Sequence, residues 1–144
     1  MTKKAPKAVY HFLPVYSRHV FFGNDQGAIK KLMLEYFNEK DLDLEVFDDE
    51  SYCQGFNAPI FSEDDPTRVM CFVLMTADSA SIGTVSHEAT HMVNQVFTYL
   101  GQEVDQINDE AQAYLLGYIV DMFMDKIRGV PSNVDRPLKK LKGK

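Results

Sequence analysis

The sequence predicts an α+β fold in which a small mixed or antiparallel sheet carries one early helix and two C-terminal helices. Strand-like segments and one helical segment fill residues 8–76, and two long helical segments follow in residues 82–126. Strands first and helices last is an order typical of α+β layers rather than of alternating parallel units. The chain has 144 residues, 45% of them hydrophobic and 25% charged, which fits one globular domain with a substantial core.

The first three elements are read from local patterns. Residues 8–16 are rich in Val, Tyr and Phe, and Pro14 assigns this strand to a sheet edge. Residues 19–22 follow as its hairpin partner. Asn24 and Asp25 can cap a helix that runs to about Glu39 with its apolar residues on one face.

Three further strands are expected before the C-terminal helices. Residues 42–47 alternate apolar with acidic side chains, the period of a half-buried strand. Residues 55–61 form a weaker strand pattern because Pro59 interrupts it. Residues 69–76 are a continuous apolar run, which predicts a strand covered on both faces.

The two long helices have recognisable ends. The first runs from about Ile82 to Leu100 and is ended by Gly101, a residue suited to a left-handed cap. The second starts near Asn108, where an Asn cap and the following acidic residues complement the helix dipole, and it runs to about Lys126.

One segment of the first long helix carries candidate chemistry, His87-Glu88-Ala89-Thr90-His91. Histidines four residues apart on a helix point to the same side, so two ring nitrogens can bind one ion at about 2.0–2.1 Å. Glu88 lies one step round the helix, where a carboxylate can take a proton from a metal-activated water and pass it to a leaving amine. The segment predicts a Zn²⁺ site for peptide-bond hydrolysis; the alternative is a pair of structural histidines.

The rest of this helix agrees with an exposed histidine pair. With about 100° per residue, a polar arc forms on the His87 side of the helix. The arc contains His91, Asn94, Gln95 and Thr98. Apolar residues occupy the opposite arc, so one face should pack on the sheet and the other should present both histidines.

A catalytic zinc needs a third protein ligand, with water in the fourth position. The downstream candidates are Glu103, Asp105, Asp109 and Glu110. We choose Glu110, with Asp109 in reserve, because Glu110 leads a helical stripe of Tyr114, Gly117 and Asp121. The small residues Ala113 and Gly117 should let the two helices approach closely.

The two motifs together resemble the zincin metallopeptidases, and more narrowly the gluzincin type. The matching residues are the His87–His91 segment and, after a turn, Asp109-Glu110-Ala111-Gln112-Ala113-Tyr114. The pairing is also similar to small zincin-like proteins encoded by bacteriophages. The resemblance covers roughly residues 69–121, and residues 1–68 match in size and strand content only.

The resemblance implies a zincin-like sheet whose edge strand, here residues 69–76, lies beside the active-site helix. A substrate peptide or protein would add to that edge as an extra strand. It also implies that His87, His91 and Glu110 bind zinc and that Glu88 is the general base. Several gluzincins have an acidic residue one turn after the glutamate ligand, where this chain has Tyr114. The Tyr114 hydroxyl could donate to the oxyanion, or the ring could pack in the helix interface.

The charge distribution divides the chain into a domain and a tail. Residues 128–144 carry six basic residues and one acidic residue, a net charge of +5. Because the net charge of the whole chain is −6, residues 1–127 have a net charge of −11. The acidic domain disfavours nucleic acid, which only the basic, flexible tail could contact. No apolar run reaches about 18 residues and no signal peptide is recognisable. These features predict a cytoplasmic protein without a membrane partner, in the host cytoplasm if a phage encodes it.

A second class of function remains open. The small chain has little room for specificity subdomains, so the same scaffold could serve as a non-enzymatic binding protein or inhibitor of a partner protein. Cys53 and Cys71 are expected to be buried thiols rather than a disulfide. His11 and His19 are expected to be structural, with oxyanion stabilisation as the alternative.

Overall fold

The computed structural model describes residues 5–13, 15–48, 54–103, 107 and 109–130. Its elements are β1 (Ala8–Leu13), β2 (Arg18–Gly23), α1 (Gln26–Tyr36), the 3₁₀ turns η1 (Glu39–Asp41) and η2 (Glu45–Asp48), β3 (Gly55–Phe61), β4 (Val69–Thr76), α2 (Ile82–Tyr99) and α3 (Glu110–Lys126). The predicted α+β class, with one early helix and two C-terminal helices, is confirmed. No helix within these residues is both long and apolar enough to cross a bilayer.

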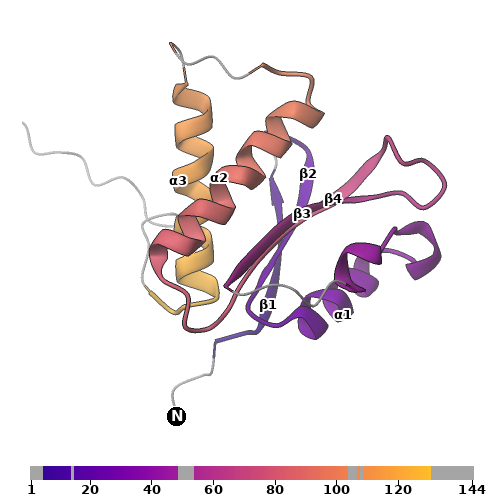
Figure 1. The fold of residues 1–144 in the computed structure, drawn as a ribbon, viewed down its shortest axis with the longest axis horizontal. Helices are drawn as coiled ribbons and strands as arrows, with labels where there is room; N and C mark the ends of the chain where they lie inside the picture. Colours follow the sequence, from indigo (N-terminus) through magenta and orange to yellow (C-terminus); the bar gives the residue numbers. More distant parts are fainter. Residues whose placement is uncertain (1–4, 14, 49–53, 104–106, 108, 131–144) are drawn as a thin grey trace, which may run out of the picture.

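The four strands form one mixed sheet in the order β1-β2-β4-β3. β1 and β2 pair antiparallel as the predicted hairpin, β2 and β4 pair parallel, and β3 pairs antiparallel to β4 at the far edge. Helices α2 and α3 lie on one face of this sheet and α1 lies on the other (Figure 1). The sheet is therefore the middle of three layers.

Each face of the sheet has its own apolar core because successive side chains in a strand point to opposite faces. Phe22 and Phe72 pack with α2 and α3, whereas Phe21 and Val73 pack with the α1 residue Ile29. All five side chains are fully buried. The prediction that residues 69–76 form a strand covered on both faces is confirmed.

The position of that strand in the sheet was predicted wrongly. β4 lies between β2 and β3, so residues 69–76 are internal and the edge strand beside α2 is β3. β3 has the predicted bounds of 55–61 despite Pro59. The edge position explains this tolerance, since a proline there can leave its missing N–H on the unpaired side.

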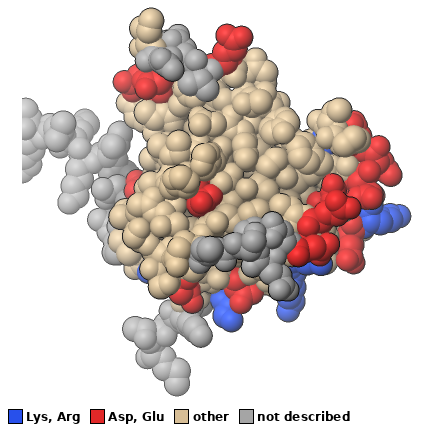
Figure 2. Space-filling view, viewed as in Figure 1, with Lys and Arg blue, Asp and Glu red and all other residues tan. Residues whose placement is uncertain are grey.

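The predicted strand at residues 42–47 is also wrong. Only Leu42 forms a β-bridge, to Ser62, and Glu45–Asp48 form a 3₁₀ turn. The Asp43 carboxylate accepts a hydrogen bond from the Glu45 backbone N–H at 3.1 Å, a local bond that competes with strand pairing. Acidic side chains gather on this end of the molecule, around η1, η2 and the β3–β4 loop (Figure 2).

Two element ends differ from the predicted limits. The first strand ends at Leu13 rather than residue 16, and the first helix ends at Tyr36 rather than near Glu39. Phe37 leaves the helix in an extended conformation, and its ring contacts His19 on the sheet edge-on, with centroids 5.4 Å apart. Packing of this aromatic residue against the sheet therefore accounts for the early end of α1.

Candidate metal centre

Helix α2 presents the predicted polar and apolar faces. Ser81 caps its N-terminus by accepting a hydrogen bond from the Thr84 N–H at 3.2 Å, and Gly101 follows its end with φ +72°. The buried residues of the helix are Val85, Ala89, Met92, Val93, Val96 and Phe97. His87 and His91 are exposed on the opposite side. The amphipathic pattern that assigned them to an open face is confirmed.

The two imidazoles converge on one point. Their Nε2 atoms are 3.2 Å apart, and the rings are nearly perpendicular, at 81°. Two nitrogens bound tetrahedrally to one zinc ion at about 2.0–2.1 Å would lie about 3.3 Å from each other. The donor type and the spacing of the pair therefore fit two adjacent zinc ligands.

Glu88 lies on the side of α2 that faces the edge strand. Its Oε2 accepts a hydrogen bond from the Asn57 side-chain amide, and Asn57 lies in the middle of β3. Further along, the ring of Tyr99 contacts that of Phe61, with centroids 5.7 Å apart. Helix α2 thus follows β3 along its length, and the Glu88 carboxylate lies where this helix contacts the sheet edge.

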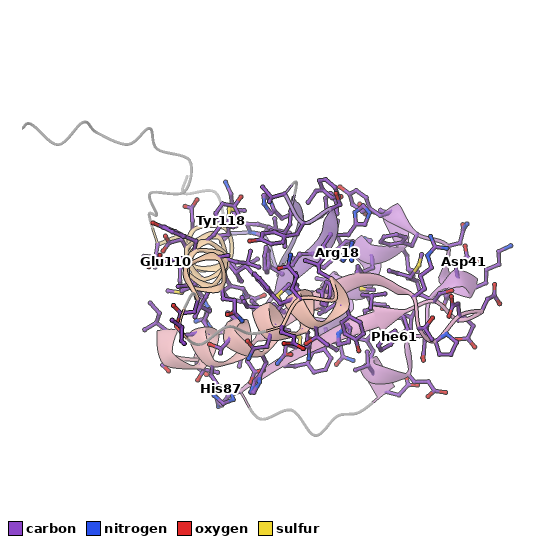
Figure 3. The ribbon with its side chains drawn as sticks, turned by 90° about the horizontal axis from the view of Figure 1, so that it is seen from above. Arg18, Asp41, Phe61, His87, Glu110 and Tyr118 are labelled. Atoms are coloured by element: carbon purple, nitrogen blue, oxygen red, sulfur yellow. The ribbon has the colours of Figure 1, made fainter. Side chains whose placement is uncertain are left out.

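Helix α3 does not bring its predicted ligand to the pair. Glu110 is exposed at the first position of α3, and Figure 3 shows His87 on the side of α2 that points away from α3. Within the described ranges, no three His, Cys, Asp or Glu side chains are grouped to hold one metal ion. The structure therefore brings His87 and His91 together, but it does not bring Glu110 to them.

The other described candidates for the third ligand are not brought to the histidine pair either. Asp109, the reserve choice, lies in a cleft of about 300 Å³ between α2 and α3. The cleft is lined by Thr90, Val93, Asn94, Asp109, Gln112, Ala113 and Leu116. Glu103 is exposed, and Asp105 lies outside the described residues. The surface of α2 that meets α3 is therefore the Thr90–Asn94 side, next to the histidines but not including them.

The stripe expected to face the histidines instead faces solvent. Tyr114 is 75% exposed, so of the two roles expected for it, packing of the ring in the helix interface is wrong. The inward face of α3 is formed by Leu115, Ile119, Met122 and Phe123. Burial of these apolar residues turns the polar stripe outward.

Gly117 does not mediate a close approach of the two helices. A Cβ built at this glycine has no atom within 4 Å among the described residues, and the position is exposed in the middle of α3. Gly117→Ala should therefore raise the free energy of unfolding by roughly 0.5–1 kcal/mol, because alanine loses less backbone entropy in a helix. Urea denaturation measures this change. A loss of stability would show that the helix needs a glycine here.

The two remaining histidines each share a hydrogen bond with a tyrosine. His11 Nε2 lies 2.8 Å from the Tyr118 hydroxyl, and His19 Nδ1 lies 2.8 Å from the Tyr10 hydroxyl. The first pair joins β1 to α3, and the second lies within the aromatic residues on the α1 face. Both pairs support the prediction of structural histidines.

Burial of His19 has a consequence for stability. Desolvation lowers the pKa of this imidazole below its usual 6.5, so the folded state binds fewer protons than the unfolded state as pH falls through 6.5. Stability contributed by neutral His19 is therefore present above about pH 6.5 and is lost as pH falls toward the folded-state pKa. Wild type should lose more unfolding free energy than His19→Gln between pH 7.5 and 5.5 in urea titrations. Equal losses would contradict this assignment.

Two features of the site were not predicted from the sequence, Gly55 and Asn57. Because side chains alternate along a strand, residues 55 and 57 lie on one face of β3, and this much can be predicted from the sequence. The sequence does not show which helix residue covers that face. Cys71 is a free, buried thiol as expected, and burial raises its pKa to about 12. Cys53 lies outside the described residues.

Arg128, the first residue of the basic segment, is hydrogen-bonded to the end of β4. Its guanidinium donates to Thr76 Oγ1 at 2.9 Å and to the carbonyls of Ala77 and Asp78. These bonds fasten the end of α3 to the end of β4. Residues 131–144 lie outside the described part.

Comparison with known proteins gives no relative from which a function could be transferred. The chain matches no protein-family model, no curated protein and no solved structure.

Proposed function

We propose that this protein is a zinc-dependent peptidase whose site lies between α2 and the edge strand β3. The single observation that carries the proposal is the 3.2 Å separation of the His87 and His91 Nε2 atoms, one residue away from a carboxylate. Zinc held there would polarise the scissile carbonyl and lower the pKa of water. Two neutral imidazoles suit zinc better than magnesium or calcium, which prefer oxygen ligands.

Different residues of the chain would bind the metal, transfer the proton and hold the substrate. His87 and His91 would hold the ion, and Glu88 would take a proton from the attacking water and deliver it to the leaving amine. A peptide substrate would pair with the outer edge of β3 ahead of Phe61, whose carbonyl already accepts from the Asp43 N–H. Main-chain hydrogen bonds would hold the peptide there regardless of its sequence. A catalytic zinc has three protein ligands. The proposal therefore requires one further donor besides the two imidazoles, and the position of Glu110 does not favour that residue.

The experiment that tests this function is incubation of the zinc-loaded protein with a broad peptide library, followed by mass spectrometry. Zinc-dependent cleavage that chelation removes and added zinc restores would support the peptidase. A protein that holds one zinc ion per chain and cleaves nothing would refute it. We place the activity in the cytoplasm, a setting in which the free thiol of Cys71 stays reduced.

A second candidate is a non-enzymatic binding protein built on the same scaffold. The observation that favours it is the outward orientation of the α3 stripe, because an exposed Glu110 and Tyr114 leave the predicted third ligand and oxyanion donor in solvent. This candidate predicts that Glu88→Gln keeps full biological function, whereas the peptidase predicts that it does not.

A further inference from the structure

The carboxylate of Glu88 is held by the edge strand rather than by its own helix. Asn57 donates to Oε2 from the middle of β3, 31 residues earlier in the chain. Gly55 lies two residues before Asn57 and therefore on the same face of the strand, where an added side chain would meet Glu88. Two strand residues thus fix the direction in which a helix side chain points.

The absence of a side chain at Gly55 makes this position of Glu88 possible. A Cβ built on Gly55 would lie 2.7 Å from Glu88 Cγ and 3.2 Å from Glu88 Oε1. It would also lie 3.2 Å from Thr84 Cγ2, one turn earlier on α2. Any other residue at position 55 would therefore push the Glu88 side chain off the strand.

The Asn57 amide is fixed in one orientation by the charge of its partner. Its Nδ2 faces the carboxylate, and a flipped amide would place Oδ1 against a negative oxygen. Oδ1 is buried and has no hydrogen-bond partner among the described residues. A buried acceptor without a partner is unfavourable, so an amide placed only for stability would not be left half satisfied.

From these contacts we infer that Gly55 and Asn57 are positioning residues for Glu88, and that they orient its second oxygen, Oε1, for the reaction. The inference rests on the proposed peptidase function. Asn57 occupies Oε2, which leaves Oε1 to accept the proton of the attacking water. The leaving amine then receives that proton from the same oxygen, so Asn57 keeps its bond through the whole cycle.

The first test needs no enzymatic activity. The side-chain amide signals of Asn57 are assigned by ¹⁵N NMR in the full-length protein and compared with those in Glu88→Gln and Glu88→Ala. A carboxylate acceptor shifts the bonded proton downfield, so we expect the signal to move upfield in Glu88→Gln and further in Glu88→Ala. An Asn57 signal that is the same in all three proteins would overturn the inference.

The second test separates positioning from a merely structural role. Asn57→Asp has nearly the same shape but cannot donate to Glu88, and Gly55→Ala displaces the Glu88 stem. Each should lower kcat about 10–100-fold with KM and zinc affinity within about threefold of wild type. Asn38→Asp, an exposed change on the far side of the sheet, is the matched control and should leave kcat unchanged. Wild-type kcat in Asn57→Asp would overturn the inference.

The two tests also distinguish this inference from the proposed function. If the amide signal responds to Glu88 but zinc-loaded wild type cleaves no peptide, the contact stands and the peptidase is refuted, and with it the catalytic purpose of the contact. If Glu88→Gln abolishes cleavage but the Asn57 amide signal is the same in wild type and in the Glu88 variants, the peptidase is supported and the positioning role is refuted.

Discussion

Glu88→Gln is expected to lower kcat for peptide hydrolysis by about 10²–10⁴-fold, the range over which a positioned general base contributes. Glutamine keeps the shape of the side chain and an oxygen that can accept the Asn57 hydrogen bond, but it cannot take a proton from water. Folding and zinc affinity should therefore remain near wild type, and the loss should lie in the chemical step rather than in binding.

Steady-state kinetics on a peptide identified in the library, with bound zinc measured in the same preparations, checks this prediction. Glu35→Gln is a suitable control, since Glu35 is an exposed residue of α1 on the opposite face of the sheet. Cleavage by Glu88→Gln at the wild-type rate would exclude Glu88 as the base and would favour the binding-protein candidate.

The fold was predictable because its local and long-range signals agree. The run at residues 69–76 is apolar at consecutive positions, and such a pattern requires cover on both faces, which α1 and α2 supply. The same observation also excludes an edge position, because a strand of this kind is best protected in the interior. Assignment of this strand to the edge came from the resemblance, and the strand pattern itself pointed elsewhere.

The geometry of the candidate site was predictable where its residues lie on one helix. The spacing of His87, Glu88 and His91 fixes their relative positions through helix geometry alone, and the 3.2 Å pair follows from it. Contacts between different helices and strands could not be predicted in this way, because no fixed geometry relates their residues. Gly55 and Asn57 reach Glu88 only because α2 runs alongside β3, and the sequence does not specify how the helix is aligned on the strand.

Two stripes of residues on α3 could each have faced α2 and the sheet, and the orientation of the helix shows which one does. The stripe of Glu110, Tyr114 and Gly117 suggested a second wall of the metal site, but the stripe of Leu115 and Ile119 has more apolar area to bury. Burial of one leucine or isoleucine contributes about 1.5–3 kcal/mol, more than an exposed polar contact returns. The apolar stripe therefore sets the rotation of the helix.

Zinc affinity should fall by at least about 100-fold in His87→Ala and in His91→Ala, because loss of a direct ligand should exceed the 10–100-fold effect typical of outer-shell partners. In contrast, Glu110→Gln and Asp109→Asn should leave it within about twofold of wild type. Their carboxylates lie on α3 or in the α2–α3 cleft, on a different side of α2 from the imidazole pair. Competition titration against a chromophoric chelator measures all four variants on one scale.

The comparison between these variants decides how the site is built, because each replacement removes one donor without adding bulk. Equal weakening by Glu110→Gln and His91→Ala would mean that α3 turns its first residue toward the pair when zinc binds, which would restore the gluzincin ligand set. Weakening by the histidine variants alone would assign the third donor to another residue. Co²⁺ substitution counts the donors independently, since a tetrahedral ion absorbs far more strongly than an octahedral one. If neither histidine variant weakens binding, the 3.2 Å convergence of the imidazoles has no role in holding a metal.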